Sequence, residues 1–209
     1  MTTGVATPPL GGSSKSPREE FLMEMYSRLW DNISRHVTIS WQAITAVFTA
    51  TAALALSEKR VLNVDVAASL VLIVCAWAVC HYYDASAWYN RNLVIVANIE
   101  RQFLKDEDVK EIHFYFTRHR NPTMIEHFKL HSGLVIAIGL LVLGYHFAER
   151  VLPGLRHPGS SFEFSRAVPY AVAVVGLVSV WMVRHAVTAK YKMLLTLSPG
   201  KPAPPTPQA

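Results

Sequence analysis

Four stretches of this chain carry no Asp, Glu, Lys or Arg, and they constrain its fold more than any other feature. They are Val37–Leu56, Val66–Tyr83, Ser132–Ala148 and Ala167–Val183. A helix needs about 20 apolar residues to cross the roughly 30 Å hydrocarbon core of a bilayer, and aromatic residues at its ends extend a shorter run. Only 17% of the residues are charged, against about 25% in soluble domains. We therefore expect four transmembrane helices, with the lipid bilayer as a partner.

The segments outside these spans are also helical in pattern, so the predicted fold is all-α: an integral membrane four-helix bundle. Over 17–36 the apolar residues recur at helical spacing, which predicts a cytoplasmic amphipathic helix before the first span. No Gly or Pro occurs from Val66 to Leu104, so the second helix should extend into the cytoplasm as one helix of about 39 residues. The remaining parts are a cytoplasmic helical segment over 84–131 and disordered tails over 1–16 and 198–209.

The distribution of basic residues predicts the orientation. Of the 20 Lys and Arg residues, fifteen lie in the two tails and the middle segment, and five lie in the two short loops. Because cytoplasmic segments carry the excess of Lys and Arg, both termini should be cytoplasmic. The net charge of +5 fits this asymmetry without nucleic acid as a partner.

Polar residues recur along one face of two predicted spans. On the first span they are Thr38, Gln42, Thr45 and Thr49, spaced by four, three and four residues. On the second helix the same spacing joins Trp77, His81, Asp84, Trp88, Arg91, Ile95, Asn98 and Gln102. Polar groups within a bilayer usually face protein or water. The two rows are therefore either seams between helices or, in an assembly of several copies, the lining of a polar pore.

Two further patterns carry alternative chemistry. His127 and His131 stand four residues apart, a spacing that suits two metal ligands, but no HExxH pattern accompanies them. Arg120 and His127 have the Arg-x6-His spacing that resembles the loose motif of HEPN-type ribonucleases, just after a short helix expected around Asp108–Arg118. We expect no metal site, cofactor or catalytic residue, and keep a membrane-tethered ribonuclease as a third hypothesis.

Two segments carry a family resemblance. Asp84–Leu104, DASAWYNRNLVIVANIERQFL, and Ile112–Arg120, IHFYFTRHR, resemble a family of small bacterial four-span proteins to which no activity is assigned. A span pair followed by a long cytoplasmic helix is also similar to the two-span effector modules of bacterial nucleotide-signalling defence systems. These resemblances imply a multi-pass protein of the bacterial inner membrane.

The function we expect is non-enzymatic: a homo-oligomer that forms or regulates a membrane pore, as a stress or defence effector. The candidate residues are those of the two polar rows, namely Thr38, Gln42, Thr45, Thr49, His81, Asp84, Arg91 and Asn98. The alternative is a membrane anchor or scaffold whose cytoplasmic helices recruit a soluble protein partner.

Overall fold

The computed structural model describes residues 16–105, 107–108, 126–156 and 163–198, and almost all of this part is helical. Four helices are long and apolar enough to cross a membrane. They are α1 (Pro17–Glu58), α2 (Val64–Phe103), α4 (Glu126–His146) and α6 (Val168–Leu197). Three short elements connect the last two helices: a π-helical turn η2 (Phe147–Val151), α5 (Leu152–Arg156) and a 3-10 turn η3 (Phe164–Ala167).

Local sequence signals explain where α1 begins and ends. Ser16 caps its N-terminus: the Ser16 hydroxyl accepts from the Glu19 amide at 3.2 Å, and the Glu19 carboxylate accepts from the Ser16 amide at 2.8 Å. At the C-terminus, the amide of Arg60 donates to Ser57 and that of Val61 to Leu56. This pattern needs a left-handed residue, and Arg60 supplies it with a φ of 57°.

The continuous second helix predicted over Val66–Leu104 is confirmed as α2, which has 40 residues. Asn63 caps it by accepting from the amide of Asp65 at 2.7 Å. At 1.5 Å per residue α2 is about 60 Å long, twice the thickness of a hydrocarbon core. The short helix expected around Asp108–Arg118 falls almost wholly outside the described residues.

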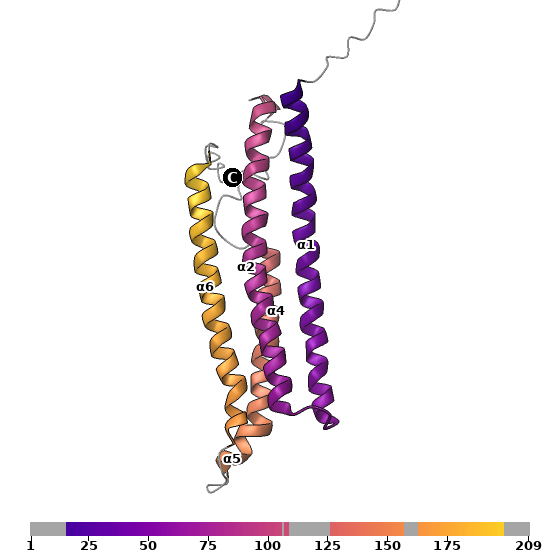
Figure 1. Cartoon of the computed structure of the whole chain (residues 1–209), viewed down its shortest axis with the longest axis vertical. Coiled ribbons are helices and arrows are strands. Elements are labelled where there is room, and N and C mark those ends of the chain that lie inside the picture. Colours follow the sequence, from indigo (N-terminus) through magenta and orange to yellow (C-terminus); the bar gives the residue numbers. More distant parts are fainter. Residues whose placement is uncertain (1–15, 106, 109–125, 157–162, 199–209) are drawn as a thin grey trace, which may run out of the picture.

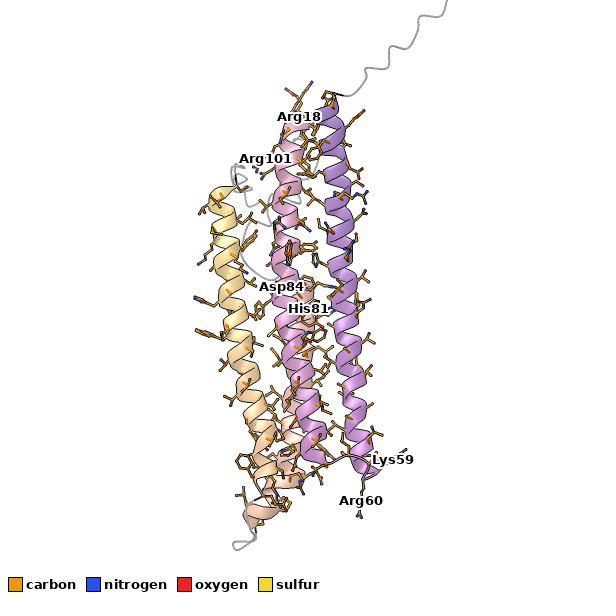
Figure 2. The ribbon with its side chains drawn as sticks, viewed as in Figure 1. Arg18, Lys59, Arg60, His81, Asp84 and Arg101 are labelled. Carbon is orange, nitrogen blue, oxygen red and sulfur yellow. The ribbon has the colours of Figure 1, made fainter. Side chains whose placement is uncertain are left out.

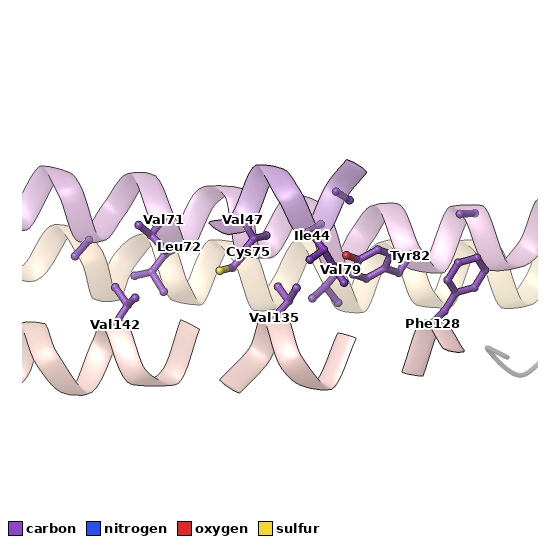
Figure 3. Packing of buried hydrophobic residues seen from close by; sticks show 14 residues of the cluster. Ile44, Val47, Val71, Leu72, Cys75, Val79, Tyr82, Phe128, Val135 and Val142 are labelled. Carbon is purple, nitrogen blue, oxygen red and sulfur yellow. The ribbon is translucent and has the colours of Figure 1, made fainter. Parts of the chain in front are cut away.

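The long helices lie side by side, and α2 is the central one (Figure 1). It packs along α1, α4 and α6, whereas α1 touches α4 only briefly. The main core lies where α1, α2 and α4 meet, as Figure 3 shows. Its most deeply buried members include Val47, Val71, Tyr82, Phe128 and Val135, each less than 2% exposed. The space between these three helices is therefore lined by closely packed, mostly apolar side chains.

A second apolar cluster holds together the charged halves of α1 and α2. Leu29 and Ile33 of α1 pack against Leu93, Val96 and Ile99 of α2. The hydroxyl of Tyr26 donates to Glu100 at 3.1 Å, and Arg18 donates to Gln102. The two helices therefore stay paired along the segments that we predict to be cytoplasmic.

Helix α6 packs mainly against α2 and leaves most of its apolar surface uncovered. In its most apolar window only 6% of the residues are buried, and Val175, Leu177 and Trp181 are each at least 65% exposed. The contact with α2 is close at one point, because a Cβ added to Gly176 would lie 2.8 Å from the Cβ of Ala76. In water, so large an exposed apolar face would lead to association.

Candidate functional site

The polar row of α1 lies on the outer surface of the chain. Thr38, Gln42, Thr45 and Thr49 are all exposed, so no other described helix covers them. Each threonine hydroxyl donates to the carbonyl four residues earlier, at 2.9–3.2 Å, which satisfies it within its own helix. The Gln42 carboxamide makes no hydrogen bond within the described part of the chain. A seam on this face would therefore need a partner from outside the chain.

The polar row of α2 borders both α1 and α6. Trp88 stacks on His36 of α1 with ring centroids 6.5 Å apart, and Asp84 and Arg91 line a groove shared with α6. His81 and Asp84 lie about halfway along α2 (Figure 2). His81 stacks on Trp77 with ring centroids 5.5 Å apart, and its Nε2 is buried without a hydrogen-bond partner among the described residues. The Arg91 guanidinium lies 4.8 Å from the centre of the Trp88 ring. Trp77 and Trp88 thus contact the polar residues His81 and Arg91 of the same row.

The structure brings Asp84 and Arg91 together at a groove, and it places Asn98 further along. The groove measures about 510 Å³ and lies between α2 and α6, whose Lys190 also lines it. Beyond it, the Asn98 amide donates to the Ser198 hydroxyl at 2.9 Å, so this residue joins α2 to the end of α6. The two predicted rows do not meet in one chain: the α1 row is exposed, and the α2 row lies between α1 and α6.

The most connected polar site lies at the opposite end of the helices, near Lys59 and Arg60 in Figure 2. Asp65, in the first turn of α2, accepts from His146 Nε2 at 3.1 Å and from Arg150 Nε at 2.9 Å. The second carboxylate oxygen accepts from Arg150 Nη2 at 3.3 Å. His146 Nδ1 lies 3.2 Å from the hydroxyl of Tyr170. We call these four residues, with Glu163 and Arg166, the Asp65 cluster.

The centre of the Asp65 cluster is deeply buried, and the cluster as a whole is balanced in charge. The side chains of His146 and Asp65 are 0% and 3% exposed. Glu163 pairs with Arg150 at 3.0 Å and with Arg166 at 3.1 Å, so two carboxylates balance two guanidinium groups. The hydrogen bond and charge of Arg166, then those of Arg150, lower the pKa of the exposed Glu163 carboxyl. The cluster joins α2, the end of α4 and the start of α6 at a fixed register.

His146 and Arg150 lie four residues apart, which puts both side chains on one helix face and lets both reach one carboxylate. The π-helical turn η2 begins between them and ends two residues before Pro153, which has no backbone N–H and whose ring disturbs the preceding helical turn. Such π-helical turns are found mostly within α-helices and frequently at functional sites. Sequence reasoning missed this site because Arg150 and Arg166 were counted only as basic loop residues and Asp65 was not singled out. The signal was there: an Asp at one span end, and a His and an Arg four residues apart at another.

His127 and His131 lie together at the other end of the spans. Their ring centroids are 4.3 Å apart, and His131 packs 4.8 Å from the Trp41 ring. His127 Nε2 lies 3.3 Å from the Ser40 hydroxyl. Among the described residues, no group of three or more His, Cys, Asp or Glu side chains is placed to hold a metal ion. Arg120 lies outside the described residues, so the Arg120–His127 pair stays a prediction.

Comparisons with protein-family models, curated proteins and solved structures gave no match for this chain. The resemblance carried by Asp84–Leu104 and Ile112–Arg120 therefore stays a prediction.

Proposed function

We propose that this chain is a multi-pass protein of the bacterial inner membrane, and that several copies assemble so that the polar row of α1 lines or borders a path for ions. Both termini would lie in the cytoplasm, together with the paired halves of α1 and α2. The assembly would form or regulate the pore in a stress or defence response.

The exposed polar row on α1 carries this proposal. Thr38 and Thr49 are eleven positions apart, so the row extends about 16 Å, half the thickness of a hydrocarbon core. The threonine hydroxyls are satisfied locally, but Gln42 offers two donors and an acceptor that lipid tails cannot pair. A second copy, or water held between copies, would satisfy them.

The interior of a single chain supports a path between copies rather than through one copy. Where α1, α2 and α4 meet, the core is apolar, and Val47, Tyr82 and Phe128 within it are less than 2% exposed. Helix α6 lies to one side and, among the long helices, packs mainly on α2. A polar path would thus have to be built from the outer surfaces of several copies. The exposed polar row of α1, which lies within the first predicted span, is such a surface.

One observation favours a second candidate function, a membrane anchor that recruits a soluble protein. Near the start of α1, in the segment that we predict to be cytoplasmic, Phe21 is 66% exposed and Met23 is 47% exposed. Exposed aromatic and Met side chains are typical of the centres of protein–protein interfaces. In this case the protein would bind its partner as a monomer.

The first experiment is the mass of the purified protein in a mild detergent, with the bound detergent subtracted. Pore formation through α1 requires an oligomer, and four or more copies would support it. A monomer in detergent and also in lipid nanodiscs would refute the pore and leave the anchor.

Substitutions then test which face assembles. Each interhelical hydrogen bond in a membrane contributes about 0.6 kcal/mol, or about threefold in the association constant. Gln42→Leu should therefore weaken self-association at least about threefold and change the conductance in a planar bilayer. Thr51→Leu is the control, because Thr51 lies off the row and its hydroxyl also donates to its own helix, at 2.6 Å. Equal association and conductance of Gln42→Leu and Thr51→Leu would exclude the α1 row.

A further inference from the structure

A cavity of about 700 Å³ lies between α2, α4 and α6, away from the Asp65 cluster. It adjoins the groove of Asp84 and Arg91, with which it shares Ala87, Val187 and Tyr191. It exists because α4 and α6 both pack on α2 but hardly on each other. Gly133 of α4 lines it, and a Cβ added there would meet no atom within 4 Å. The cavity thus opens between two helices rather than into the core.

The lining of this cavity is cationic and rich in hydrogen-bonding groups. Lys129, Arg184 and His185 line it, and no Asp or Glu is among its described lining residues. Arg184 makes no ion pair with any described residue. An arginine has five N–H donors in a planar fork that matches phosphate oxygens. The charge of Arg184 therefore suits an anion, and a phosphate group in particular.

A buried hydroxyl in the cavity wall points to a ligand independently of the charges. Ser86 of α2 is 4% exposed, and its Oγ is buried without a hydrogen-bond partner among the described residues. Leaving a buried hydroxyl unpaired costs free energy, so a polar ligand atom at this position would be stabilising.

The three walls of the cavity coincide with the same ends of three predicted spans. Its α2 residues begin at Tyr83, its α4 residues begin at Lys129, and its α6 residues include Trp181 and Arg184. Each of these positions lies at or near the end of a predicted span. In the orientation proposed above, this is the cytoplasmic boundary of the bilayer, where lipid phosphates lie. Apolar Ile136 and Trp181, both more than half exposed, form the part of the wall that would lie among the acyl chains.

We infer that this cavity binds the phosphate headgroup of an anionic phospholipid from the cytoplasmic leaflet. Arg184 and Lys129 hold the phosphate, Ser86 donates a hydrogen bond to the headgroup, and the acyl chains leave between α4 and α6 over Ile136 and Trp181. The inference rests on the proposed membrane orientation, and it assigns to the α4–α6 side a role in lipid recognition. Basic pockets between spans on the cytoplasmic side bind headgroups in this way.

Native mass spectrometry of the full chain with added phosphatidylglycerol tests the inference. Phosphatidylglycerol should bind more tightly than phosphatidylcholine, whose choline cancels the charge. Arg184→Gln should weaken phosphatidylglycerol binding about tenfold, the effect of losing a hydrogen bond to a charged group. Lys192→Gln is the matched control, because Lys192 is also exposed on α6 but does not line the cavity, and it should bind as the wild type does. Equal binding by the two variants would overturn the inference.

A second variant tests the cavity without changing its charge. Gly133→Leu places a side chain in the open space and should also weaken phosphatidylglycerol binding, while unchanged binding would contradict the site. Thermal unfolding with soluble phosphates distinguishes the source of the phosphate group. If inorganic phosphate or glycerol phosphate raises the unfolding temperature as much as phosphatidylglycerol does, the site binds a soluble anion and the lipid assignment is wrong. If phosphatidylglycerol does not bind but the protein is an oligomer, the lipid site is refuted and the proposed pore is not. If the protein is a monomer that binds phosphatidylglycerol, only the proposed pore is refuted.

Discussion

Replacing Asp65 with Asn should destabilise the protein by a measurable amount, because Asp65 is the buried centre of its cluster. The carboxylate is 3% exposed and accepts from both Arg150 and His146. Removing one partner of a buried ion pair costs about 3–5 kcal/mol. Arg150 is 29% exposed, so water can solvate part of its charge after the change, and we expect about 3 kcal/mol.

The assay is thermal unfolding of the purified protein in detergent. For a chain of this size, about 3 kcal/mol corresponds to a decrease of roughly 6–12 °C in the unfolding temperature. Glu149→Gln is the matched control: it removes one negative charge at the same end, but Glu149 is exposed and should shift stability by less than about 0.5 kcal/mol. An Asp65→Asn variant that unfolds at the same temperature as Glu149→Gln would refute the reasoning.

A double-mutant cycle would show that the loss arises from the pair itself. Combining Asp65→Asn with Arg150→Gln removes both charges, so the double variant should be less destabilised than the sum of the two single variants. Residues in one such network show interaction free energies of about 0.5–3 kcal/mol. Strict additivity would mean that Asp65 acts through something other than Arg150.

Two further predictions concern the backbone. Gly176→Ala should lower stability by about 1–3 kcal/mol, because its Cβ would lie 2.8 Å from that of Ala76. The control is Gly144→Ala, whose added Cβ meets no atom within 4 Å and which should be neutral or stabilising. Adding Ala76→Gly to Gly176→Ala should restore the lost stability. Thermal unfolding decides this, and equal effects at both glycines would contradict the close approach. Arg60→Gly should raise stability by about 0.5–1 kcal/mol, because glycine adopts the left-handed conformation of Arg60 (φ 57°) without strain. Lys59→Gly, at φ −79°, should give no such increase in the same measurement, and an increase there would argue against strain at Arg60.

The position of the polar residues shows where a sequence pattern stops being informative. Helical spacing placed Thr38, Gln42, Thr45 and Thr49 on one face of α1, but spacing cannot say what covers that face. The structure leaves the face exposed, whereas Asn98 in the row of α2 contacts Ser198 at the end of α6. The same kind of row therefore has different surroundings on the two helices.

The sequence by itself determined the helical class, the four apolar helices and the length of α2. These depend on local properties: runs without charge, helical periodicity, and the absence of Gly and Pro between Val66 and Leu104. Helix formation needs only neighbours within about four residues, so a linear pattern is enough to predict it.

Only the tertiary structure decided what each helix touches. Asp65 and Arg150 are 85 positions apart, Gly176 meets Ala76 rather than any neighbour in sequence, and the cavity lined by Ser86 and Arg184 exists because α4 and α6 pack on α2 but hardly on each other. Such contacts depend on the rotation and relative height of whole helices. Those are set by the summed packing of many side chains, which no short stretch of sequence encodes.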